Sequence, residues 1–244
     1  MKQFRIFCYI CSIIMIALIL HSLLGDIFFK LKHLNPRVTK TTTEVLSTAD
    51  DPIQIATDND DPINIKKRSD KNRIFNLKPQ AKYSITGLLV ASNSNFFLRD
   101  VLRSDFDEIC LMDFGLVWGE IGTKKYVQDN LKFKSVKTLG FARQLEYRAK
   151  NFNTLPHTWG YISSHLSHTH LIPANTNVTK ALLSVKKYDV VKLEGYLVDI
   201  YDDKNQTIAL TSLSRYDKNE TSRGYGACED MYVISVQIGN KIYK

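Results

Sequence analysis

The sequence predicts a single N-terminal transmembrane helix followed by a mainly antiparallel β (α+β) domain, whose strands a small, partly open barrel would also accommodate. Two observations predict this fold class. The first is an N-terminal apolar run, in which residues 6–25 contain no Asp, Glu, Lys or Arg. The second is a series of about seven short β-branched and aromatic runs within the last about 170 residues, separated by turn-forming residues and accompanied by few helical patterns.

The transmembrane helix is predicted from residues 4–25, which read FRIFCYICSIIMIALILHSLLG. A helix needs about 20 apolar residues to cross roughly 30 Å of hydrocarbon. A cleaved signal peptide is the alternative, because Met1 to Arg5 form a short basic region. However, the apolar run exceeds the usual length of about 7–15 residues, and no A-x-A pattern follows it. We therefore interpret residues 1–30 as an uncleaved signal anchor.

The orientation of this single span depends on its flanks. Basic residues lie on both sides, so their distribution gives no decisive asymmetry. Because the tail before the span is short, we expect it inside the cell and the large C-terminal part in the periplasmic or other extracytoplasmic space. A cytosolic C-terminal domain is the alternative.

Residues 31–74 differ in composition from the C-terminal part of the chain. They include TKTTTEV, TADDPIQ and DNDDPINIKKRSD, which combine prolines with mixed charges and show no helical or two-residue apolar period. Such a composition is typical of a flexible linker. We predict a stalk that holds a single globular domain, residues 75–244, away from the bilayer.

The elements of this domain are predicted from local patterns of apolar and turn-forming residues. Strands are expected over 83–91, 96–98, 107–114, 133–139, 189–200, 207–213 and 231–238. Helix-forming residues predict helices over 142–150 and 179–185. Within 189–200, Gly195 suggests a bulge or a sharp bend. The segment KLEGYLVDI resembles a strand pair of small oligonucleotide/oligosaccharide-type barrels, a pattern so widely shared that it predicts no family.

The formal charge is +8 for the whole chain and +6 for residues 31–244, which hold 30 basic and 24 acidic residues. Such a surplus suits a domain that faces anionic lipid, peptidoglycan or nucleic acid. The densest basic patch, IKKRSDKNR, lies in the predicted stalk. The sequence therefore gives no specific evidence for nucleic-acid binding. We expect contact with the membrane through residues 4–25 and a protein partner in the cell envelope.

Three of the six histidines, His165, His168 and His170, lie in the segment SHLSHTHLIPAN. His165 and His168 would share a helical face, whereas His168 and His170 would share a strand face. No regular element points all three imidazoles at one ion, although zinc commonly takes four N, S or O ligands. The three histidines are metal-ligand candidates, but we expect no cofactor.

Two cysteines, Cys110 and Cys228, belong to the predicted globular domain. In an oxidising compartment they would allow one disulfide, and otherwise two buried thiols. Cys228 would alternatively serve as a nucleophile with His170, while Glu229 or Asp217 orients the imidazole.

Cys228 and Glu229 end the polar segment RYDKNETSRGYGACE. Its arginines, among them Arg215, would bind an anion. A long hairpin loop before the last strand is the alternative.

The globular part contains no P-loop, H-E-x-x-H, C-x-x-C or G-x-S-x-G motif. We therefore predict a bitopic membrane protein whose extracytoplasmic β-rich domain binds or assembles with envelope partners without catalysis. The alternative is a membrane-tethered hydrolase that uses His170 with Cys228, with Glu229 or with a bound metal.

Overall fold

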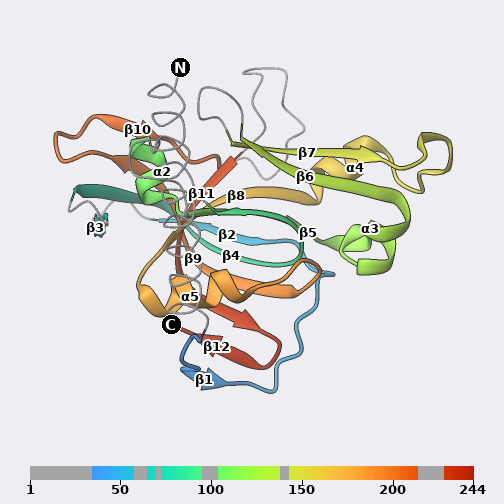
Figure 1. The fold of residues 1–244 in the computed structure, drawn as a ribbon, viewed down its shortest axis with the longest axis horizontal. Coiled ribbons are helices and arrows are strands. Elements are labelled where there is room, and N and C mark those ends of the chain that lie inside the picture. Colours follow the sequence, from blue (N-terminus) through green and yellow to red (C-terminus); the bar gives the residue numbers. More distant parts are fainter. Residues whose placement is uncertain (1–34, 58–64, 70–72, 95–103, 138–142, 214–227) are drawn as a thin grey trace, which may run out of the picture.

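The computed structural model describes residues 35–57, 65–69, 73–94, 104–137, 143–213 and 228–244 (Figure 1). The predicted transmembrane segment and the expected strand over 96–98 lie outside these residues. Within them, the helices are too short or too polar to cross a bilayer.

The described chain is mainly β, with few helices. Its strands are β1 (Lys40–Thr41), β2 (Ile53–Ala56), β3 (Ile65–Arg68), β4 (Ile74–Ser94), β5 (Met112–Val117), β6 (Leu131–Lys137), β7 (Arg143–Ala149), β8 (Leu166–Pro173), β9 (Val190–Tyr201), β10 (Thr207–Ala209), β11 (Cys228–Ile238) and β12 (Lys241–Tyr243). Its helices are α2 (Asp105–Ile109), α3 (Lys124–Asn130), α4 (Trp159–Ser164) and α5 (Thr176–Ser184), with short 3₁₀ turns η2 (Gly119–Ile121) and η3 (Phe152–Thr154).

Ten of these strands form one mixed sheet in the order β1-β12-β11-β8-β5-β4-β9-β10, with β2 and β3 also paired to β4. The β8–β11 ladder is parallel, and the other ladders between described strands are antiparallel. Strand β11 pairs with β8 through its first half and with β9 along most of its length. The pairings β4–β5, β5–β8, β8–β11, β11–β9 and β9–β4 therefore form a closed circuit of five strands. The prediction of a mainly β domain is confirmed, but the sheet is mixed because β8 and β11 run in the same direction.

Alternate side chains of these five strands form separate cores. One face contributes the largest apolar cluster, which includes Phe114, Leu171, Leu193 and Met231 and is completed by Leu182 of α5. The opposite face carries two smaller clusters, one around Ile162 and Leu166 and the other around Ile109 and Ile172. A set of polar side chains from strands β5, β8 and β11 also lies on this second face, between the residues of these two clusters.

Gly195 lies where β9 and β11 approach each other closely. A Cβ atom at this position would lie 1.9 Å from the carbonyl oxygen of Tyr232. The ladder shifts register between Val233 and Ser235, directly beside it. The bend or bulge predicted from Gly195 therefore corresponds to a close backbone approach, which only glycine permits.

Part of the predicted stalk belongs to the sheet. Strands β2 and β3 pair with β4, and β1 pairs with β12. Ile53 and Ile55 of β2 are 60% and 58% exposed. These strands are held by backbone pairing and bury little apolar surface, which is why their composition resembles that of a linker.

Two local predictions differ from the structure. The helix predicted over 142–150 is wrong, because β7 covers most of this range and pairs with β6. Its exposed and partly buried side chains alternate with a period of two, and tertiary pairing overrides the helix propensity of its residues. The strand predicted over 107–114 begins later, because Ser104 and Asp107 form a capping box that starts α2. The strands predicted over 83–91, 133–139, 189–200, 207–213 and 231–238 and the helix predicted over 179–185 are found with shifted ends.

Candidate metal centre

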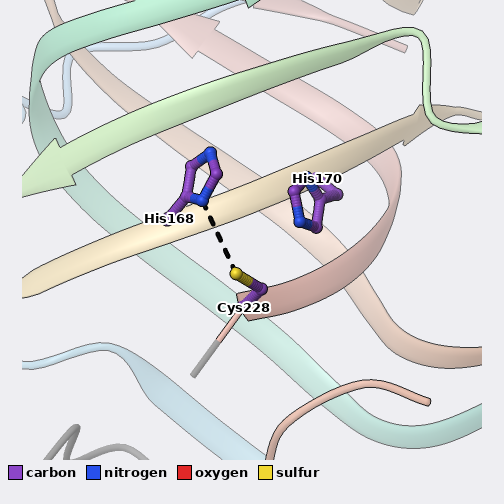
Figure 2. Close-up of side chains that lie close together, drawn as sticks. All are labelled: His168, His170 and Cys228. Carbon is purple, nitrogen blue, oxygen red and sulfur yellow. Dashed lines mark hydrogen bonds between the residues drawn. The ribbon is translucent and has the colours of Figure 1, made fainter. Parts of the chain in front are cut away.

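Two neighbouring parallel strands place four chemically active side chains on one face of the sheet. Cys228 of β11 lies opposite His168 of β8, and Asp230 lies opposite His170. Because side chains alternate along a strand, the pairs at i and i+2 point to the same side. The H-x-H of β8 and the C-x-D of β11 therefore meet in register, as Figure 2 shows for three of these residues.

Three of these side chains bring their ligand atoms close together. One ligand atom from each of His168, His170 and Cys228 lies within 4.8 Å of the other two. The Sγ atom of Cys228 is 3.5 Å from Nδ1 of His168. The two imidazole rings meet edge to face, with 4.8 Å between their centroids. The sequence pattern predicts a pairing of Cys228 with His170, whereas the hydrogen-bonding distance is to His168.

Asp113 of β5 orients His170 from the other side. It lies opposite His170 in the antiparallel β5–β8 ladder, and its Oδ1 is 2.7 Å from Nδ1 of His170. Nδ1–H therefore donates to the carboxylate, which leaves Nε2 as the ring nitrogen with a lone pair. Phe106 packs against the ring edge to face at 5.0 Å and limits its rotation.

Arg143 of β7 covers this group with a fully buried guanidinium. Its Nη1 is 3.0 Å from Oδ1 of Asp113 and donates to the carbonyl oxygen of Cys110 at 2.9 Å. Its Nε lies 3.8 Å from Asp107, and its guanidinium lies 4.7 Å from the centroid of the Phe106 ring. Strand β7, which local composition predicts as a helix, thus supplies the counter-charge of the site.

Burial dominates the electrostatics of the site. It lowers the pKa of His168 to about 4, and the neighbouring His170 adds to this shift. Burial also raises the pKa of Asp230 to about 6. Within the described residues, Nε2 of His168 and Oδ1 of Asp230 are buried without a hydrogen-bond partner. Buried polar atoms of this kind are uncommon, because a polar atom that leaves water without gaining a hydrogen-bond partner destabilises the folded state.

Glu229, one of the carboxylates predicted to orient His170, lies on the opposite face of the sheet. Its Oε2 accepts hydrogen bonds from Ser167 at 2.6 Å and Thr169 at 3.3 Å, and its Oε1 lies 3.5 Å from the hydroxyl of Tyr83. As a neighbour of Cys228 along one strand, it necessarily points the other way.

The remaining candidates lie apart from this cluster or outside the described residues. His165 ends α4, where its Nδ1 is 2.9 Å from the carbonyl oxygen of Tyr161 and its ring stacks on the Tyr161 ring at 3.9 Å. Arg215 and Asp217 lie outside the described residues.

Both cysteines of the globular part are thiols, and no disulfide joins them. Cys110 is fully buried, and burial raises the pKa of its thiol well above the usual range. Cys228 is partly exposed and lies at the start of β11, beside His168.

Sequence reasoning missed Asp113, Arg143 and Asp230. Asp230 could have been found from the sequence, because it lies two positions after Cys228 and directly before the strand predicted over 231–238. Asp113 and Arg143 join the site through long-range pairing that no local pattern specifies. No protein-family model, curated protein or solved structure matches this chain, so its function has to be inferred from the geometry of the site itself.

Proposed function

We propose that this protein is a single-pass membrane protein whose extracytoplasmic domain is a small, partly open barrel that binds one Zn²⁺ ion through His168, His170 and Cys228. The observation that carries the proposal is the approach of three ligand atoms to within 4.8 Å of one another. The closed circuit of pairings through β4, β5, β8, β11 and β9 supports the barrel. The metal-loaded domain would then bind partners in the envelope without catalysis of its own.

The donor set suits zinc. Zn²⁺ prefers imidazole nitrogen and thiolate sulfur, with bonds of about 2.0–2.3 Å that place tetrahedral ligands about 3.5 Å apart. The donor atoms, which lie within 4.8 Å of one another, would therefore move about 1 Å closer together on binding, and side-chain rotation can supply this movement. The thioether ligand of many copper sites has no counterpart among the neighbouring methionines, since Met112 and Met231 belong to the core on the opposite face.

The groups around the donors support the same assignment. Asp113 holds His170 in the tautomer whose Nε2 can bind a metal, which is the carboxylate–histidine arrangement common around zinc. Asp230 adds a buried carboxylate on the same face, and its Oδ1 has no hydrogen-bond partner within the described residues. The charge of a bound cation would offset the cost of burying this carboxylate. Asp230 lies outside the group of donor atoms within 4.8 Å of one another, so its carboxylate would have to move toward the ion to become the fourth ligand.

The metal site is favoured over a Cys–His hydrolase. A nucleophilic thiolate is normally stabilised by a protonated imidazole beside it. The pKa of His168 is lowered to about 4 by burial, which favours the neutral ring. A neutral imidazole is the form that binds metal.

Titration of the metal-free, reduced full chain in a non-ionic detergent tests the proposal. Co²⁺, used as a coloured substitute for Zn²⁺, should bind at one equivalent, give thiolate-to-cobalt absorption, and be displaced by Zn²⁺. His170→Ala and Cys228→Ser should each weaken binding by about 100-fold or more, since even losing a group that orients a ligand costs about 10–100-fold. His165→Ala is the matched control and should bind as the wild type does.

Alkylation read by peptide mapping completes the test. Bound Zn²⁺ should protect Cys228, whereas Cys110 should stay unmodified with or without metal because it is fully buried. Equal Co²⁺ binding by the wild type and Cys228→Ser would contradict the metal site. Rapid alkylation of Cys228 below pH 7, unaffected by Zn²⁺, would favour the hydrolase instead.

A further inference from the structure

The segment predicted as a stalk is already fixed to the domain at Arg37. The backbone N–H of Arg37 donates to Oδ1 of Asn177 in α5 at 2.7 Å, and its carbonyl oxygen accepts from Nδ2 of Asn177 at 2.9 Å. The same Nδ2 also donates to the carbonyl oxygen of Lys244 at 3.0 Å. Strand β1 follows directly and pairs with β12. The domain therefore holds the chain well before residue 75, where the sequence predicts that the globular part begins.

This attachment shortens the free tether between the domain and the N-terminal apolar run. Only residues 26–36 separate the end of the run at Gly25 from Arg37. Fully extended, this stretch reaches about 40 Å, and a flexible chain of the same length averages roughly 20 Å between its ends. When residues 4–25 cross a bilayer, as proposed above, the tether brings the junction of α5, β1 and β12 to the membrane surface.

The parts of the chain that meet at this junction carry basic residues only. Strands β1 and β12 lie together at one end of the molecule, next to α5 and the C-terminus (Figure 1). Residues 35–43, 174–185 and 239–244 contain five Lys or Arg residues and no Asp or Glu. We call these five the basic edge: Arg37, Lys40, Lys180, Lys241 and Lys244. Four of them are exposed, and Lys180 is half-buried.

The cations of the basic edge surround the outermost strand of the sheet. Strand β1 is the terminal strand in the sheet order. Lys40 lies opposite Ile242, and Lys241 lies opposite Thr41, so the two lysines point to opposite faces of the β1–β12 ladder. Neither face of the ladder therefore holds all the cations. A planar surface that approaches β1 edge-on would reach the cations on both faces.

The basic edge has no partner of opposite charge within the part of the chain that the structure describes. No carboxylate there forms an ion pair with any of its five residues. Other exposed cations do have such a partner, as Lys125 has in Asp129 at 2.7 Å. A cluster of one sign attracts anions from solution over about 8–10 Å at physiological salt.

We propose that the basic edge docks on the surface of a bilayer that contains anionic lipid, so that the domain lies against the membrane. Two observations carry the proposal. The short tether brings this end of the domain to the bilayer, and the charge of this end is opposite to that of an anionic headgroup layer. Nucleic acid would be attracted by the same charge, but the tether favours the lipid surface. The inference rests on the proposed single span, and it depends neither on the orientation of the span nor on the metal centre.

Lysine acetylation of the full chain in lipid nanodiscs, mapped by peptide mass spectrometry, tests this inference. With phosphatidylglycerol as about a third of the lipid, Lys40, Lys241 and Lys244 should react at least about threefold more slowly than in pure phosphatidylcholine nanodiscs. The difference should shrink at 1 M salt, because the screening length falls to about 3 Å. Lys204 lies in the turn between β9 and β10 and should react equally in both kinds of nanodisc.

Two double variants separate a local effect from net charge. Lys40→Glu/Lys244→Glu should abolish most of the protection of Lys241 in anionic nanodiscs, because repulsion replaces attraction at the basic edge. The matched variant Lys78→Glu/Lys82→Glu makes the same change of charge at exposed positions of β4 and should retain the protection. Equal loss of protection in the two variants would overturn the inference, because it would reflect net charge alone.

A carbonate wash of liposomes of the same lipids distinguishes failure of the docking from failure of the span. A chain that resists the wash, but whose lysines react equally in the two kinds of nanodisc, would overturn the docking alone. A chain that the wash releases would overturn the proposed span and the docking with it. Protection of these lysines by a 20-residue oligothymidylate, with none from phosphatidylglycerol, would overturn the inference in favour of nucleic acid. The Co²⁺ titration should be the same in all these variants, because the metal ligands are unchanged.

Discussion

Gly195→Ala is expected to destabilise the domain by at least about 4 kcal/mol, a large part of the about 5–15 kcal/mol that stabilise an ordinary domain. The new Cβ atom would lie 1.9 Å from the carbonyl oxygen of Tyr232 and 3.2 Å from the Cα atom of Val233. Both are backbone atoms, so no side-chain rotation relieves the contact. The β9–β11 ladder would have to separate, and this ladder closes the circuit of five strands.

Gly160→Ala is the control for this effect. Its Cβ atom would meet only Thr158 Oγ1, at an ordinary 3.9 Å, and Gly160 lies within α4. Alanine is favoured over glycine in a helix, so this variant should gain up to about 1 kcal/mol. Urea unfolding of the full chain, followed by tryptophan fluorescence, compares the two variants with the wild type. If the urea midpoint of Gly195→Ala equals that of the wild type, the two strands can separate at this position without a loss of stability.

Gly195 also shows which parts of the fold a local pattern can predict. A glycine inside an alternating apolar run indicates a break in the strand from local composition alone. The sharing of one strand face by His168 and His170 is predictable in the same way, because it follows from the two-residue period. Such features depend on neighbours in the sequence.

The rest of the site depends on which strands pair. Cys228 meets His168 because β8 and β11 are parallel neighbours, although 60 residues separate them in the chain. Asp113 reaches His170 through a different ladder. Arg143 reaches Asp113 only because residues 143–149 form a strand, although their composition favours a helix. Pairing partners and parallel direction are global properties, and the local patterns of this chain do not specify them.

Arg143→Met is expected to lower the free energy of unfolding by about 3–5 kcal/mol at pH 7.5, because it removes one partner from a buried ion pair. The Arg143 side chain is 0% exposed and that of Asp113 is 1% exposed. Methionine fills similar space but provides no charge and no donor. Asp113 and Asp107 would then stay buried without their guanidinium. By contrast, Lys125→Met removes an exposed ion pair with Asp129 and should leave the unfolding midpoint unchanged.

The pH dependence of this loss identifies its cause. In Arg143→Met, a stranded carboxylate binds a proton more readily in the folded than in the unfolded state. The stability of the variant should therefore rise, relative to that of the wild type, as the pH falls from 8 to 5. Adding Asp113→Asn should recover part of the loss at pH 7.5, because the amide carries no charge. Urea unfolding at several pH values measures both effects. The opposite outcome would be a loss of unfolding free energy that stays constant with pH and that Asp113→Asn increases further. It would mean that Arg143 stabilises the fold by packing, and not by balancing the charge of the carboxylate that orients His170.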